Sequence, residues 1–259
     1  MKALLDLYYT EEKHPARMLD LFLPEGEGFP VLLYFHGGGM ESGSRKEFRI
    51  MAEHLCAHGV AVASADYRMY PNAAYPDFLV DAAAAAAWVK GHIGEYGGSG
   101  RVYLGGTSAG GYISMMLCFD DRYLTAVGLS PADIVGYVHD AGQPTVHFNV
   151  LRERGVDTRR IVVDEAAPLY YIGLAKEYAP MLFLISDHDM ECRHEQTELV
   201  LASMRHFGYD QSKVFHRILH GSHCSYCNEL DEQGESVLGR EIYAFIRACE
   251  ASSNKGDIR

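Results

Sequence analysis

The chain has 259 residues, of which 48% are hydrophobic and 22% are charged. This balance is ordinary for a soluble globular protein and suffices to bury one sizeable core. Its 35 acidic and 23 basic side chains give a formal net charge of −12. Because such a field repels phosphate backbones and anionic lipid surfaces, we expect neither nucleic acid nor a membrane as partner.

The cellular setting is predicted from three negative observations. Asp6 follows a short apolar run, which interrupts the uncharged stretch that a signal peptide needs. No window approaches the roughly 18 apolar residues of a membrane span. Six cysteines are too sparse in a chain of this length to form a disulfide framework. We therefore expect a reduced, cytoplasmic location; the oligomeric state stays open, and a homo-oligomer is compatible with the sequence.

Short apolar runs alternate with segments of helical period along the chain. The predicted strands are an antiparallel one at 17–23, followed by 31–35, 60–65, 102–104, 126–129, 181–185 and 214–219. The predicted helices are 47–58, 77–92, 109–119, 193–207 and 235–249. This alternation is typical of βαβ units. It predicts an α/β protein with a mostly parallel central sheet flanked by helices on both faces.

Residues 131–180 depart from this rhythm. They form a long interval of Gly, Pro, His and charged residues between two predicted strands. A connection of this length in a compact domain usually has a function or carries extra elements. We predict that 131–180 is a lid or cap inserted within a single domain that spans residues 1–259. The polar segment 252–259 is expected to fray.

The pattern Gly106-x-Ser108-x-Gly110 stands between a predicted strand and a predicted helix. A nucleophile at such a junction occupies a sharp turn, and flanking glycines let neighbouring backbone pass without Cβ clashes. The helix behind Ser108 also directs its first amides at negative charge that develops there. A glycine-rich turn with a capping serine is the structural alternative. The flanking strand and helix favour Ser108 as a nucleophile.

Three consecutive glycines, residues 37–39, follow His36 and the predicted strand 31–35. Backbone amides in a tight glycine turn can stabilise a tetrahedral oxyanion without reorganisation of side chains. The alternative is a plain flexible loop. His36 is expected to brace this loop and not to transfer protons.

An acid for the triad is expected after the strand 181–185. A serine nucleophile needs a base, and the base needs a carboxylate that fixes its tautomer. Three acids of this loop compete: Asp187, Asp189 and Glu191. We select Asp189, in the chain order serine, acid, histidine. Asp187 is interpreted as a solvated loop acid.

Two histidines follow the last predicted strand and could reach the nucleophile. His223 lies further into the loop and is the predicted base, whereas His220 is expected to pack or to cap. Together with Cys224 and Cys227 they also suggest a zinc site. Adjacent His223 and Cys224 are awkward ligands for one ion, and zinc there would leave Ser108 without a base. We therefore predict no metal and no cofactor.

These motifs together resemble the hormone-sensitive-lipase-like branch of α/β-hydrolase esterases, which includes many bacterial acetyl-esterase-like proteins. The resemblance rests on residues 36–39, Asp66-Tyr67-Arg68, residues 106–111, Asp189 and Gly221-x-His223. It implies the α/β-hydrolase fold, a structural role for residues 66–68, and an oxyanion hole formed by the amides of Gly38, Gly39 and Ala109.

The expected activity is hydrolysis of a small-molecule carboxylic ester through an acyl-enzyme, with the triad Ser108, His223 and Asp189. Because residues 131–180 show no sustained apolar stripe, short-acyl or acetyl esters are expected, and acetylated sugars are plausible. Two alternatives remain. An amide or formamide hydrolase of arylformamidase type would use the same residues, and a ligand-binding member of the fold would have lost catalysis.

Overall fold

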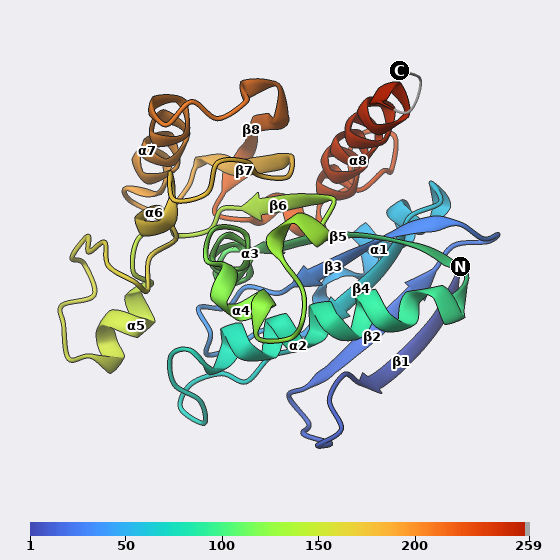
Figure 1. Ribbon diagram of the computed structural model, residues 1–259, viewed down its shortest axis with the longest axis horizontal. Coiled ribbons are helices and arrows are strands. Elements are labelled where there is room, and N and C mark those ends of the chain that lie inside the picture. The colour runs from blue at the N-terminus through green and yellow to red at the C-terminus, as the bar shows by residue number, and fades with distance from the viewer. Residues whose placement is uncertain (257–259) are drawn as a thin grey trace.

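The computed structural model describes residues 1–256 and contains one sheet of eight strands (Figure 1). The strand order is β1-β2-β4-β3-β5-β6-β7-β8. Both β1–β2 and β2–β4 pair antiparallel, and every later neighbour pairs parallel. The strands are β1 (Lys2–Tyr8), β2 (Met18–Leu23), β3 (Phe29–Phe35), β4 (Ala61–Ala65), β5 (Gly98–Thr107), β6 (Gly136–Asp140), β7 (Met181–His188) and β8 (Val214–Ser222).

Helices cover both faces of this sheet, as the sequence predicted. The α-helices are α1 (Arg49–Ala57), α2 (Asp77–His92), α3 (Ala109–Phe119), α4 (Asp121–Thr125), α5 (Phe148–Glu153), α6 (Pro168–Tyr171), α7 (Arg193–His206) and α8 (Val237–Gly256). Short 3-10 turns are η1 (Arg45–Phe48), η2 (Ile93–Tyr96), η3 (Pro131–Asp133), η4 (Gln211–Lys213) and η5 (Ser225–Asn228). Core residues of α2, α3 and α7 pack on one face, and those of α1 and α8 on the other.

The central strands are buried on both faces, which explains their continuous apolar runs. On β3, Val31 and Leu33 belong to the core under α2 and α3, whereas Leu32 and Tyr34 belong to the core under α1 and α8. All four side chains are fully buried. Burial of one such aliphatic side chain stabilises the fold by about 1.5–3 kcal/mol. The three-layer arrangement holds the carboxyl ends of the parallel strands in fixed register.

Two helix predictions, 77–92 and 109–119, are confirmed residue for residue by α2 and α3. The strand predicted at 126–129 is wrong. Those residues close the turn behind α4, where the amide of Leu129 donates to Leu124 and Gly128 has a φ of +77°. A glycine in this conformation is a common helix C-terminus. Edge strand β1 was not predicted, because its side chains are mostly exposed.

The next strand in the sheet is instead β6, inside the segment predicted as a lid. It pairs with β5 on one side and β7 on the other. Residues 131–180 are therefore not inserted over their whole length, since 136–140 belong to the sheet. Two polar residues of β6, His139 and Asp140, favoured a loop in the sequence, yet both side chains are buried in the structure. A lid function for the remaining residues, which carry α5 and α6, stays a prediction.

The last helix is longer than predicted. α8 continues to Gly256, so 252–256 are helical and not frayed, while 257–259 lie outside the described residues. Across the part of the chain that the structure describes, none of the helices has the length and apolar character needed to cross a bilayer.

Candidate active site

Ser108 occupies the strained turn that the sequence predicted between β5 and α3. Its φ is 55° and its ψ is −109°, a conformation that is unfavourable for a residue with a Cβ. The two flanking glycines make this turn possible. A Cβ added to Gly106 would lie 2.5 Å from the backbone of Gly110, and one added to Gly110 would lie 2.1 Å from the carbonyl oxygen of Phe35. Neither position can accept a larger residue without a backbone shift.

Three of the predicted site residues form a continuous hydrogen-bonded chain. The Nε2 atom of His223 lies 2.9 Å from Ser108 Oγ, and its Nδ1 atom lies 2.5 Å from Asp189 Oδ1. The carboxyl side chain of Asp189 is only 1% exposed and also accepts from the amides of Ser186 and Met190. Burial alone would raise the pKa of Asp189, but its bond to His223 and these amides lower it below the ordinary value.

The competing acid and base candidates lie elsewhere. Asp187 accepts from the amide of Gly221 and contacts Nδ1 of both His188 and His220. The side chain of His220 is 89% exposed and neither packs nor caps, so that expectation is wrong. Glu191 is also exposed. The ends of β7 and β8 and the residues after them thus carry two aspartate–histidine pairs, and only the pair of Asp189 and His223 reaches Ser108.

The glycine loop after β3 contacts Ser108 through Gly37, where an added Cβ would lie 3.2 Å from Ser108 Cβ. Gly38 and Gly39 have φ values of +88° and +65°. A Cβ added to Gly38 would lie 2.2 Å from the Ser42 carbonyl oxygen. Within residues 1–256, neither glycine amide donates a hydrogen bond. Together with the amide of Ala109 at the start of α3, they are the donors proposed for the oxyanion.

His36 supports the glycine loop through its contacts with Tyr67. Its buried ring stacks on Tyr67 with 4.5 Å between the ring centroids, and the Tyr67 hydroxyl donates to the His36 carbonyl oxygen. Burial lowers the pKa of His36 and so favours the neutral ring. The neighbouring Asp66 accepts from Arg45, while Arg68 binds Asp81 at 2.8 Å. These contacts are consistent with a structural role for residues 66–68.

Sequence reasoning missed Asp140, which is fully buried at the end of β6. Its carboxylate accepts from the hydroxyl of Tyr226 and, at 2.7 Å, from that of Thr107. Thr107 directly precedes Ser108, and Tyr226 lies three residues after His223. Burial raises the pKa of Asp140 to about 6. The signal was an aspartate at the carboxyl end of a central strand, which went unnoticed because that strand was not predicted.

Asn149 of α5 was also missed, and no local pattern marks it. The residue is 2% exposed, and its Nδ2 donates to the Gly39 carbonyl oxygen and to Glu41. Arg152, one turn later, forms an ion pair with Glu41 on the surface. Part of the segment that follows β6 therefore lies against the glycine loop.

A cavity of about 660 Å³ opens at the far end of α3, between Phe119, Tyr137 and Tyr178. Since α3 is 11 residues long, it separates this cavity from Ser108 by roughly 16 Å. None of the triad residues lines it. We do not assign it to the reaction.

Part of the chain is similar in sequence to a protein-family model and to proteins named as esterases. Residues 19–126, less than half of the chain, match the family model named BD-FAE. The esterase LipI of Mycobacterium tuberculosis is 38% identical over 96 residues, which are 36% of this chain and 30% of LipI. The chain spans less than a third of the length of the first curated relatives that it matches.

Solved structures match over nearly the whole chain. A truncated carbohydrate esterase from gut microbiota has a TM-score of 0.76 at 16% identity, covering 96% of this chain and 97% of that one. Esterase B from Lactobacillus rhamnosis has a TM-score of 0.79 at 15% identity, covering 100% and 89%. The chain therefore has the α/β-hydrolase fold, and part of its sequence is similar to the BD-FAE family model and to proteins named as esterases.

Proposed function

We propose that this protein hydrolyses carboxylic esters and that Ser108 is its nucleophile. One observation carries the proposal: the hydroxyl of Ser108 is hydrogen-bonded to His223, which is in turn hydrogen-bonded to the buried carboxylate of Asp189. A nucleophile, a base and an orienting acid at these distances are the parts that acyl transfer requires. The relatives named as esterases support the same class of reaction.

The proposed reaction has two halves. His223 Nε2 accepts the Ser108 proton while Oγ attacks the ester carbonyl carbon, and the carbonyl oxygen becomes an oxyanion held by the amides of Gly38, Gly39 and Ala109. Asp189 stabilises the imidazolium. The C–O bond of the ester then breaks, and His223 returns the proton to the leaving alcohol. Water attacks the acyl-enzyme by the same route and releases the acid and free Ser108.

A short acyl group is the substrate that the surroundings favour. The helix against the glycine loop presents Asn149 and Arg152, and Glu41 lies beside them. A long acyl chain gains only about 0.8 kcal/mol for each CH2 that is enclosed by apolar surface, and these three side chains present polar groups instead. We therefore propose acetyl to butyryl esters, with acetylated sugars among the alcohols. The carbohydrate esterase of similar fold is compatible with this choice.

The central test is the variant Ser108→Ala with p-nitrophenyl acetate as substrate. The folded variant should lose nearly all turnover, and a fluorophosphonate should label the native protein at Ser108 but leave the variant unlabelled. Retention of near-native turnover by the folded variant would end the proposal. Circular dichroism and thermal unfolding serve as controls for folding.

A further inference from the structure

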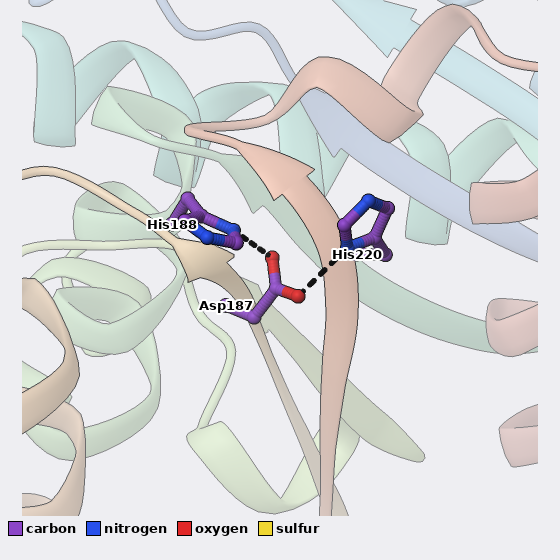
Figure 2. Close-up of side chains that lie close together, drawn as sticks. All are labelled: Asp187, His188 and His220. Atoms are coloured by element: carbon purple, nitrogen blue, oxygen red, sulfur yellow. Dashed lines mark hydrogen bonds and ion pairs between the residues drawn. The ribbon is translucent and has the colours of Figure 1, made fainter.

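A second group of histidine and carboxylate side chains lies at the ends of β7 and β8, on the surface. Figure 2 shows the carboxylate of Asp187 between the imidazole rings of His188 and His220. Each Nδ1 atom is 2.8 Å from a different oxygen of that carboxylate. One ligand atom from each residue lies within 4.8 Å of the others. None of these three side chains contacts Ser108, and the reaction proposed above uses none of them.

From this arrangement we infer that Asp187, His188 and His220 bind one divalent transition-metal ion, with zinc as the best match. Two imidazoles and one carboxylate are ligands that suit zinc, and they do not suit Mg²⁺ or Ca²⁺, which select oxygen atoms. Two protein ligands of one zinc ion lie roughly 3.3–4.2 Å apart. The three ligand atoms already lie within 4.8 Å of one another, so rotation of the two exposed imidazoles would bring them around one ion, and water would complete the coordination.

The carboxylate is already held in place for this role. The backbone amide of Gly221 donates to Asp187 Oδ1 at 2.9 Å, so the acid at the end of β7 is anchored to the end of β8. The neighbouring strands stay paired as far as His188 and Ser222, with a shift of register between Ser186 and His188. Of the three ligands, only the two imidazoles must reorient. The overall charge of −12 also raises the local concentration of cations.

The site is distinct from the zinc arrangement that the sequence suggested. In the structure His223 is hydrogen-bonded to Ser108 and Asp189, and Cys227 is buried against Thr107. The proposed ligands instead face solvent, with 74% and 89% of the His188 and His220 side chains exposed. The inference goes beyond esterase activity and does not depend on it.

The test is zinc binding to the full chain by isothermal titration calorimetry, with the Ser108→Ala variant measured in parallel. We expect one equivalent to bind saturably to both proteins. His188→Ala and His220→Ala, which remove exposed side chains, should each weaken binding at least ~10-fold. Asp187→Asn should weaken it as well. The matched controls are His206→Ala, another exposed histidine, and Cys192→Ser, an exposed thiol; both should bind as the native protein does.

A second readout is the thermal unfolding midpoint, because an ion that binds only the folded state must stabilise it. Zinc should raise the midpoint of the native protein, EDTA should reverse the rise, and His220→Ala should show no rise. Absence of saturable binding, or native binding by both His188→Ala and His220→Ala, would overturn the inference. Because Ser108→Ala is included, failure of the metal site and failure of the esterase proposal give separate results.

Discussion

The hydroxyl of Tyr226 donates a buried hydrogen bond to Asp140, which ties the segment after His223 to the strand β6. The same carboxylate accepts from Thr107, the residue before Ser108. Both donors are buried, as is the carboxylate itself. One buried acid therefore holds the two loops whose relative position sets the distance from Ser108 to His223.

Asp140 should make the stability of the fold depend on pH. Burial raises its folded pKa to about 6 from an ordinary 3.8, so between these values the folded state binds the proton that the unfolded state has lost. The resulting cost is complete above pH 6, on the order of 3 kcal/mol, and disappears below pH 3.8. We compare the free energy of unfolding of Asp140→Asn with that of the native protein at each pH. This difference should favour the variant more at pH 8 than at pH 4.5. Urea unfolding of both proteins at the two pH values measures this, and parallel pH dependence of the two would contradict it.

Asn149→Ala should lower kcat by roughly 10–100-fold and leave KM nearly unchanged, because its amide positions the Gly39 peptide and not the substrate. The matched control is Arg152→Ala on the same helix. That surface ion pair with Glu41 contributes little, so its loss should change kcat less than about 2-fold. Steady-state kinetics with p-nitrophenyl acetate distinguishes the two variants. Equal losses in both would mean that α5 acts only by its general packing.

Asp189→Asn should reduce turnover by roughly 10⁴-fold while the shape is kept, since the amide leaves the His223 ring in the wrong tautomer. Asp187→Asn should cost far less, because Asp187 faces His188 and His220 and does not contact His223. The measurement is kcat for both variants under identical conditions. A reversed ranking would assign the acid to Asp187.

His223→Ala should be as damaging as Ser108→Ala, because no other side chain hydrogen-bonds to Ser108 Oγ among the described residues. His220→Ala should keep most of the activity, since that ring lies on the surface. Rates of Ser108 phosphonylation by a fluorophosphonate compare the two variants without dependence on the substrate chosen. Rapid labelling of His223→Ala would mean that another group takes the proton.

Substrate length tests the short-acyl proposal on its own. We expect kcat/KM to be highest between acetyl and butyryl esters and low from dodecanoyl upward, with each ester below its critical micelle concentration. Acetylated sugars and N-formylkynurenine belong in the same panel. A maximum at eight carbons or beyond would refute the short-acyl preference. Preference for the formamide would assign the chain to amide hydrolysis. Neither result would change the proposed roles of Ser108, His223 and Asp189.

The sequence by itself determined the features that depend on local physics. Glycine is required where backbone crosses backbone, so the turn around Ser108 and the loop at Gly38 could be recognised from residue types alone. Helices α2 and α3 were predicted to the residue, because a run of alanines and an apolar segment behind a glycine turn favour helix locally. Alternation of strand and helix was enough for the α/β class.

Only the tertiary structure decided which of several similar side chains lies near Ser108. Asp187 and Asp189 are two residues apart and similar in sequence context, and the same holds for His220 and His223. Folding turns Asp189 and His223 toward Ser108 and leaves Asp187 and His220 paired at the surface. Strand β6 and its Asp140 were missed for the same reason: burial of a short polar-looking strand depends on both neighbouring strands, β5 and β7. Contacts between distant segments, such as Asn149 with Gly39, leave no local pattern because their free energy arises only after the chain has folded.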